Sequence, residues 1–308
     1  MALLNFKKKS SEPKGVNQAV ETFLQDYSIE VMPRTAEKVE NFPDLLPTGT
    51  RVYIAHIEGT PIEDMVATAK RLNGDGYRVM PHFPARIIKD KAMLADWIAR
   101  YQGEANVDQA LLLAGGVKEP HGDFDSSMQM METGLFDVAG FKRLHVAGHP
   151  EGNRDIDTDG KFKNVNAALG WKQEFSKRTD AKMALATQFA FEAGPIIKWA
   201  DSLVDMGVDI PVHIGIAGPA KLQTLIKFAI ACGVGPSLKV LQKRAMDVTK
   251  LLLPYEPTEV VAELAAHKAA NPDFNIERVH FFPLGGIKTN ATWATENGGA
   301  SGVPASVS

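Results

Sequence analysis

Short runs of apolar and β-branched residues recur along the chain, and most are separated by stretches with helical periodicity. Such runs predict β-strands. There are eight, at residues 28–33, 51–57, 77–84, 110–115, 143–150, 183–191, 210–218 and 278–284. Between them, apolar residues three and four positions apart predict helices over 61–72, 89–100, 194–206 and 220–231.

Strands that alternate with helices predict parallel strands joined by helical crossovers. Eight such units favour the α/β class and a single (β/α)8 barrel, or TIM barrel. A doubly wound open sheet is the alternative, although no Gly-x-Gly-x-x-Gly sequence follows the first strand. We expect extra helices before the last strand, over 220–232, 237–253 and 258–270. The expected catalytic barrel spans 14–296, after a flexible arm (1–13) and before a disordered tail (297–308).

Composition narrows the cellular setting and the partners. The 308 residues carry 34 basic and 37 acidic side chains, a net charge of −3, which gives no strong attraction to nucleic acid. No apolar run reaches the roughly 20 residues that span a bilayer, and the basic cluster 7–9 follows the short apolar start, the reverse of a signal peptide. The single cysteine, Cys232, excludes an intramolecular disulfide and is expected to lie away from any active site. We therefore expect a cytoplasmic protein with no nucleic-acid or membrane partner; apolar helix faces such as 238–253 leave a homo-oligomer open.

Unusual polar and glycine residues lie within or at the ends of the predicted strands, where barrel enzymes place their active sites. These are Glu30, His56, His82, the pair Gly115-Gly116, His149, Glu151 and Gln188. Glu30 stands between Ile29 and Val31, so alternation turns it inward, where a carboxylate without a partner has a raised pKa. Inward carboxylates are often functional. Each histidine also has a purely structural interpretation, and Gly115-Gly116 suits a plain turn.

Other chemistries leave no matching motif. The first predicted strand has no histidine, and no histidines pair at a spacing typical of metal ligands, so we expect no metal site. The nucleophile elbow of serine hydrolases and the Walker phosphate loop are also absent from the sequence.

Six segments, in order, together resemble the methylenetetrahydrofolate reductase family over about residues 20–290. They are Ser28-Ile-Glu-Val-Met-Pro-Arg-Thr35, Pro81-His-Phe83, Val146-Ala-Gly-His-Pro-Glu151, Ala186-Thr-Gln-Phe-Ala-Phe-Glu192, Pro211-Val-His-Ile-Gly-Ile216 and Val279-His-Phe-Phe282. The resemblance implies a barrel that interconverts 5,10-methylenetetrahydrofolate and 5-methyltetrahydrofolate, with NADH or NADPH as hydride source and FAD as relay. It implies a short, divergent member without the regulatory domain of longer relatives.

The resemblance also implies roles for individual residues. Glu30 matches the acid that protonates the folate, a task suited to a raised pKa. Gln188 matches a glutamine that contacts the pterin, and Gly116 and Phe189 fall on the same substrate side. The positions that correspond to the flavin side are His56, His82, Ala114, Gly115, His149, Glu151 and Arg178. Arg178 would pair with the flavin's phosphates.

The sequence departs from the family at the end of the fourth strand. The family's Leu-x-Leu-Arg-Gly-Asp reads Leu111-Leu-Leu-Ala-Gly-Gly116 here, so the arginine is Ala114 and the aspartate is Gly116. Two hypotheses follow: FAD is bound in an unusual way, or hydride passes directly from the nicotinamide to the folate. A pterin-dependent methyltransferase on the same barrel is the alternative function, and a non-catalytic folate-binding protein is a third.

Overall fold

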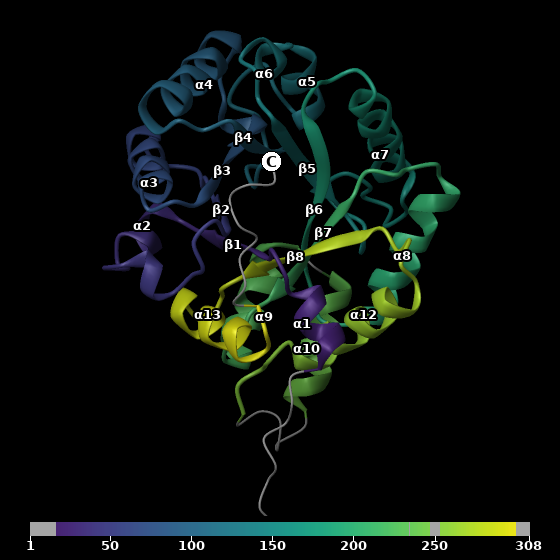
Figure 1. Cartoon of the computed structure of the whole chain (residues 1–308). Helices are drawn as coiled ribbons and strands as arrows, with labels where there is room; N and C mark the ends of the chain where they lie inside the picture. The colour runs from purple at the N-terminus through teal and green to yellow at the C-terminus, as the bar shows by residue number, and fades with distance from the viewer. Residues whose placement is uncertain (1–16, 234, 247–252, 300–308) are drawn as a thin grey trace, which may run out of the picture.

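Eight parallel strands close into a barrel in the computed structural model, which describes residues 17–233, 235–246 and 253–299 (Figure 1). The strands are β1 (Ser28–Val31), β2 (Arg51–Ile54), β3 (Arg78–Pro84), β4 (Gln109–Leu113), β5 (Arg143–Gly148), β6 (Lys182–Ala190), β7 (Val212–Ala217) and β8 (Ile276–Phe282). The last strand pairs with the first, Ser28 opposite His280, and this closes the sheet. The prediction of a (β/α)8 barrel is therefore confirmed, and the open doubly wound sheet is excluded.

Helices cover the outside of this barrel. They are α1 (Gln18–Phe23), α2 (Pro33–Ala36), α3 (Ile62–Gly74), α4 (Lys91–Ala105), α5 (Ser127–Glu132), α6 (Leu135–Val138), α7 (Lys163–Ser176), α8 (Ala193–Asp205), α12 (Thr258–Ala270) and α13 (Ile287–Glu296), with short 3-10 turns η1 (Phe42–Asp44) and η2 (Ala85–Ile87). The longest, α4, begins where the Asp90 side chain accepts the Met93 N–H at 2.8 Å and ends at Asn106 in the left-handed conformation.

Within the described residues, two further helices, α9 (Leu222–Ala231) and α10 (Gly235–Ala245), are inserted between β7 and α12. An antiparallel bridge closes the base of this insertion, since Ala220 and Tyr255 exchange backbone hydrogen bonds of 3.1 and 2.9 Å. Phe189 and Phe191 of the β6 end pack with Leu225 in a cluster separate from the main core. The helix α12 packs against α1 and α8 in the outer ring, so α12 completes the crossover to β8. The extra helices predicted over 220–232 and 258–270 are present as α9 and α12, and α10 covers the first part of the one predicted over 237–253; residues 247–252 of that prediction lie outside the described residues.

The two predicted loose ends fall largely outside the described residues, which exclude 1–16 and 300–308. Residues 297–299 are described, and there the prediction of a disordered tail is wrong. The Gly298 carbonyl accepts a 3.1 Å hydrogen bond from the Gln25 side chain, which ties this segment to the end of α1. Among the described helices, none has the length and apolar character to cross a membrane.

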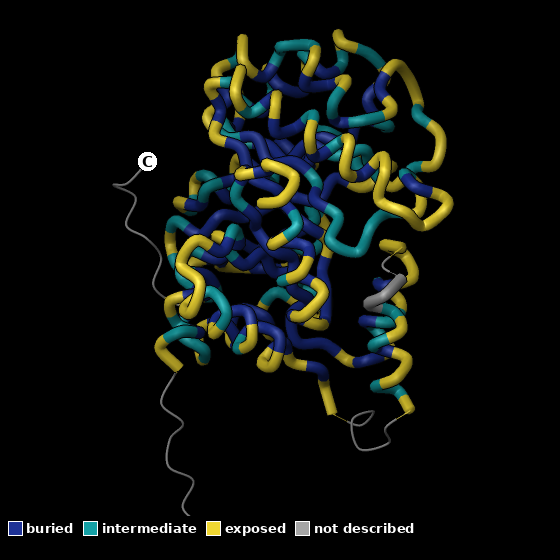
Figure 2. The backbone as a smooth tube through the Cα atoms, turned by 90° about the vertical axis from the view of Figure 1, so that its right-hand side faces the viewer, coloured by how far each residue is buried: buried dark blue, intermediate teal, exposed yellow. Residues whose placement is uncertain are grey.

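Buried residues form the interior of the molecule, and exposed residues lie mainly on its outside (Figure 2). Outward-facing strand residues such as Ile29, Val52 and Ile214 pack against the helices in the main apolar core. Inside the barrel, by contrast, many of the buried side chains are polar: Ser28, Arg51, His145, His213 and His280 are each 3% exposed or less. A small apolar layer of Tyr53, Met80, Leu111 and Ala186 lies among them.

Candidate functional site

Glu30 lies inside the barrel between two histidines from other strands. Its Oε2 is 3.2 Å from His82 Nε2, on β3, and 3.8 Å from His280 Nε2, on β8. The Glu30 side chain keeps 18% of its surface exposed, whereas His280 is almost fully enclosed. Alternation along β1 brings this arrangement about, because Ile29 and Val31 join the outer core and their neighbour must face inward.

These histidines lower the pKa of the Glu30 carboxyl, whereas the sequence predicts a raised pKa. Burial, the largest influence, raises the pKa of Glu30, but the charge of His82 and the contacts with His280 together outweigh it and lower the pKa to about 2. The prediction of a raised pKa is therefore wrong, because it assumed an apolar strand without partners. The carboxyl is ionised at neutral pH.

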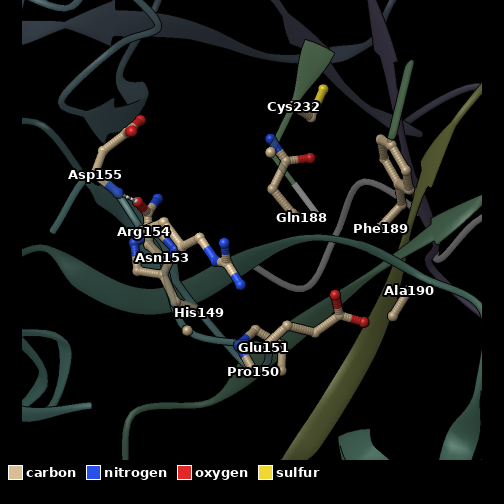
Figure 3. A pocket seen from close by; sticks show the side chains of 12 residues that line it. His149, Pro150, Glu151, Asn153, Arg154, Asp155, Gln188, Phe189, Ala190 and Cys232 are labelled. Atoms are coloured by element: carbon tan, nitrogen blue, oxygen red, sulfur yellow. Dashed lines mark hydrogen bonds between the residues drawn. The ribbon is translucent and has the colours of Figure 1, made fainter. Parts of the chain in front are cut away.

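A cleft of about 70 Å³ opens where β5, β6 and the inserted helices meet (Figure 3). Its lining comes from the loop 149–155, from Gln188 to Ala190 on β6, and from Cys232 and Gly233 after α9. The side chains of Glu151, Arg154 and Gln188 surround the same space. A carboxylate, a guanidinium and an amide around one cleft suit a ligand with both hydrogen-bond donors and acceptors.

A bulge between β6 and β7 aims Gln188 into this cleft. The register shifts between Ala186 and Phe189, and the Thr187 hydroxyl accepts the Gly215 N–H at 2.8 Å while donating to the Gln188 carbonyl at 2.9 Å. A Cβ on Gly215 would lie 2.4 Å from the Thr187 carbonyl oxygen, so only glycine fits there. Bulges of this kind re-aim side chains beside active sites.

The loop that forms one wall of the cleft is anchored by Asp157. The Asp157 carboxylate accepts the N–H groups of Asn164 and Val165 at 2.9 and 3.0 Å, at the start of α7. Under the same wall, the buried Lys172 ammonium donates to the Ala147 carbonyl at 2.7 Å, and burial lowers its pKa to about 8. Burial, with the charge of Lys172, also lowers the pKa of His149 to about 4, which keeps that imidazole neutral.

The structure brings most of the predicted site residues to one end of the barrel. His149, Glu151, Gln188 and Phe189 line the cleft, and His82 contacts Glu30. Ala114, Gly115 and Gly116 follow β4, where Gly115 has a φ of +100° and packs against Pro84. His56 is turned away into the protein, since its ring stacks on Trp97 at 4.8 Å and its Nε2 lies 3.0 Å from the Thr60 carbonyl oxygen.

Two positions differ from the sequence-based expectations. Arg178 precedes the N-terminal end of β6, whereas Gln188 lies near the C-terminal end of the same strand. The Arg178 guanidinium lies over the Phe175 ring at 4.7 Å, at the end of α7, so its position corrects the assignment to the site. Cys232 was expected far from the site, yet it lines the cleft, and burial together with the Glu30 charge raises the pKa of its thiol.

Sequence reasoning did not assign Arg154 or His280 to the site. Arg154 lies in a polar loop without a motif. His280 lies in an apolar strand, and only the pairing of β8 with β1 shows that it faces Glu30.

The positions that the resemblance assigns to the flavin side do not fit FAD. The arginine and aspartate at the end of β4 are Ala114 and Gly116, and Arg178 lies at the other end of the barrel. The side chain of His56 is held by Trp97 and Thr60. Of the positions assigned to the flavin side, none therefore offers a cation for the flavin's phosphates.

Comparisons with known proteins support the fold. No model of a known protein family matches the chain. An uncharacterised protein from Clostridium thermocellum that binds two copies of 5-methyl-5,6,7,8-tetrahydrofolic acid is similar in structure, with a TM-score of 0.56 and 11% identity over 92% of this chain and 98% of that one. A putative chitinase A from Streptomyces coelicolor has a TM-score of 0.44 and 9% identity over 88% of this chain and 99% of that one. A TM-score this low supports no conclusion about this chain. At 11% identity, the first likeness shows the shared barrel fold.

Proposed function

We propose that this protein binds a reduced folate at the C-terminal end of the barrel and interconverts 5,10-methylenetetrahydrofolate and 5-methyltetrahydrofolate with NAD(P)H. The observation that carries the proposal is the Glu30 carboxylate, held between His82 and His280 within a barrel whose Gln188 faces a neighbouring polar cleft. The six matching sequence segments support it. So does the structural neighbour that binds 5-methyltetrahydrofolate.

The proposed chemistry needs one proton and one hydride. Opening the one-carbon bridge breaks its bond to N10, which takes up the proton, and leaves a cationic methylene group on N5. Hydride from the nicotinamide ring then converts this group to methyl, and NAD(P)⁺ leaves. The low pKa of Glu30 keeps its carboxyl ionised in the free protein, so in the proposed reaction the carboxylate takes up a proton from solvent once the folate is bound and passes it to N10.

We further propose that hydride passes directly from the nicotinamide to the folate, because the flavin-side positions do not fit FAD. The absorbance spectrum of the purified protein tests this step. We expect no band near about 450 nm, where oxidised flavins absorb, together with oxidation of NADH or NADPH that depends on 5,10-methylenetetrahydrofolate. A stoichiometric flavin band that is required for turnover would overturn direct transfer.

Glu30→Gln tests the proton donor. The variant keeps the shape of the side chain but cannot exchange a proton, so we expect turnover to fall by about 10²- to 10⁴-fold with binding of 5-methyltetrahydrofolate retained. Glu104→Gln, on the exposed face of α4, is the matched control and should behave as the natural protein. Near-normal turnover in Glu30→Gln would show that another group supplies the proton.

The same assay separates the alternative functions. A methyltransferase would consume 5-methyltetrahydrofolate in the presence of a methyl acceptor without any change in NADH or NADPH. A folate-binding protein would bind 5-methyltetrahydrofolate and turn over neither compound. Either outcome would overturn the proposed reductase activity.

A further inference from the structure

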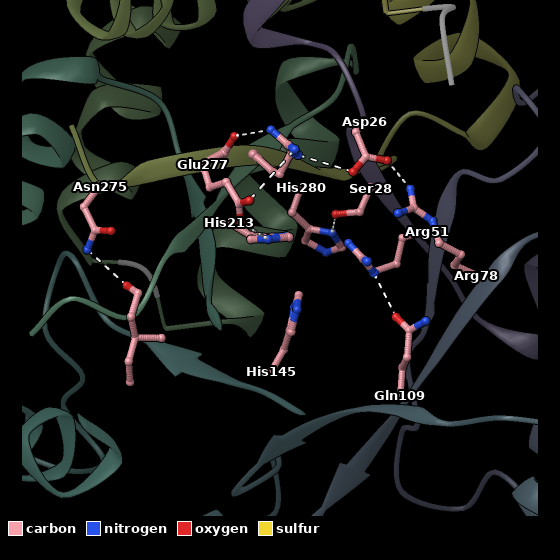
Figure 4. A network of polar contacts seen from close by, with 12 residues as sticks. Asp26, Ser28, Arg51, Arg78, Gln109, His145, His213, Asn275, Glu277 and His280 are labelled. Atoms are coloured by element: carbon pink, nitrogen blue, oxygen red, sulfur yellow. Dashed lines mark hydrogen bonds and ion pairs between the residues drawn. The ribbon is translucent and has the colours of Figure 1, made fainter. Parts of the chain in front are cut away.

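Buried polar side chains form a column inside the barrel beside Glu30, and Figure 4 shows Ser28, His280, His213 and His145 among them. At its upper end the Ser28 hydroxyl and His280 Nδ1 are 2.9 Å apart, and both residues are at most 1% exposed. The other ring nitrogen, His280 Nε2, faces Glu30 Oε2 at 3.8 Å. The proposed reductase function uses Glu30 and its contact with His280 but assigns no role to Ser28 or to the tautomer of His280.

The chemistry of the two neighbours determines where the ring proton of His280 lies. An ionised carboxylate only accepts hydrogen bonds, so Nε2 faces Glu30 favourably only when it carries the proton. Nδ1 must then be an acceptor in the neutral ring, and the Ser28 hydroxyl is the donor. Burial, the largest influence, lowers the pKa of His280 despite the opposing effect of Glu30, which keeps the ring neutral.

The rest of the column holds the His280 ring in place. The Tyr53 ring lies 4.2 Å from it, and the Tyr53 hydroxyl is hydrogen-bonded to His145 Nδ1. His145 packs against His213 with ring centroids 4.5 Å apart, and His213 Nε2 lies 3.4 Å from Glu277 Oε2 at the far mouth of the barrel. A ring enclosed on this side cannot rotate away from Glu30 without disturbing a packed layer.

The histidines contact one oxygen of the Glu30 carboxylate. Within the described residues, His82 Nε2 and His280 Nε2 both lie closest to Oε2 of this carboxylate, at 3.2 and 3.8 Å. The two imidazoles therefore face the same carboxylate oxygen from two different strands.

We propose that Ser28 and His280 are positioning residues for Glu30: the Ser28 hydroxyl selects the Nε2–H tautomer of His280, and that N–H orients the carboxylate toward the folate. The role of Glu30 in this statement rests on the proposed function, whereas the tautomer and its dependence on Ser28 do not. The groups that face His280 are Ser28, Glu30, Tyr53, His82 and Phe282, with the charge of Arg51 nearby.

Long-range proton–nitrogen correlation spectra of protein labelled with ¹⁵N-histidine test the tautomer without any ligand. We expect His280, assigned from the signals lost in His280→Gln, to be protonated at Nε2 in the natural protein and in Ser28→Thr. In Ser28→Ala we expect a mixture of the two tautomers. Protonation at Nδ1 in the natural protein, or an unchanged single tautomer in Ser28→Ala, would overturn the proposal.

Steady-state kinetics with 5,10-methylenetetrahydrofolate test the positioning role. We expect Ser28→Ala to lower kcat by about tenfold with little change in KM, because a misdirected catalytic group slows the chemical step more than binding. Ser28→Thr should restore kcat, and Ser202→Ala, which removes a hydroxyl from the outer helix α8, should leave it unchanged. Unaltered kcat in Ser28→Ala would refute positioning.

A second pair of variants keeps the test informative if Ser28→Ala does not fold. His280→Gln retains an N–H donor for Glu30, whereas His280→Leu does not, so we expect the glutamine variant to keep the higher kcat. Equal kcat in the two variants would contradict the proposed role. If the natural protein shows the expected tautomer but no reductase activity, the proposed function fails while the Ser28–His280 assignment stands.

Discussion

Acidification is expected to destabilise this barrel through the imidazoles in its interior, and His213 provides the sharpest test. Its side chain is 2% exposed, and burial, reinforced by the charges of Arg51 and Arg143, lowers its pKa from the usual 6.5 to about 4. In the unfolded chain the same group titrates near about 6.5. The unfolded state therefore binds a proton first as the pH falls, and protonation favours unfolding.

The size of the effect follows from the two pKa values. The stability that His213 contributes is fully present above about pH 6.5 and is lost as the pH falls toward about pH 4. The loss is about 2 kcal/mol at about pH 5 and about 3 kcal/mol at about pH 4. This is a large part of the 5–15 kcal/mol (an approximate general range) that stabilises most folded proteins.

The perturbation is His213→Gln, which removes the titrating group from the centre of the barrel. Urea unfolding followed by circular dichroism gives the free energy of unfolding at about pH 7 and about pH 5. The difference between the two values should be about 2 kcal/mol smaller in His213→Gln than in the natural protein, whatever the absolute stability of the variant. His121→Gln, at a half-exposed surface position, is the control and should leave the difference unchanged. A variant with the full pH dependence of the natural protein would refute the reasoning.

Three further changes have defined outcomes. Gly215→Ala places a Cβ against two backbone carbonyl oxygens of β6, so it should cost about 1–3 kcal/mol in chemical unfolding and raise the KM for folate, whereas Gly170→Ala, in open space on α7, should be neutral or stabilising. Asp157→Ala should speed amide hydrogen exchange at the start of α7, and Asp159→Ala, at an exposed position, should not. The free energy of unfolding should rise between about pH 8 and about pH 10.5, because over this range the buried Lys172 is neutral in the folded state and still charged in the unfolded state. Lys172→Met should abolish this rise of up to about 3 kcal/mol. A Lys172→Met variant that still shows the rise would contradict the burial of the charge.

The barrel is predictable from sequence because parallel strands are covered on both faces and read as short apolar runs. The runs extend beyond several strands: the run over 51–57 contains β2 (Arg51–Ile54), since the chain stays extended after the last ladder hydrogen bond. The helix α7 was not predicted, and without it no local signal shows at which end of the barrel Arg178 lies.

The site is only partly predictable because its key contacts join distant strands. Alternation within β1 is enough to turn Glu30 inward. The low pKa of Glu30, however, depends on His280, which reaches it through the pairing of the first strand with the last. Cys232 follows α9, a helix that periodicity predicts, but periodicity does not show that the end of this helix lies beside the cleft. Composition and residue spacing predict individual strands and helices. The contact between Glu30 and His280 exists only because the barrel closes.

The backbone bridge between Ala220 and Tyr255 makes the inserted helices a modular unit. The two ends of the insertion meet at this bridge, so the positions of Ala220 and Tyr255 beside the strands do not depend on the length of the segment between them. Lengthening the excursion costs only the slowly growing entropy of loop closure, about 0.6 kcal/mol for each doubling of length. The wall of the cleft that carries Cys232 can therefore be exchanged, shortened or grafted from another protein without moving Glu30. Laboratory evolution of ligand preference would best begin there.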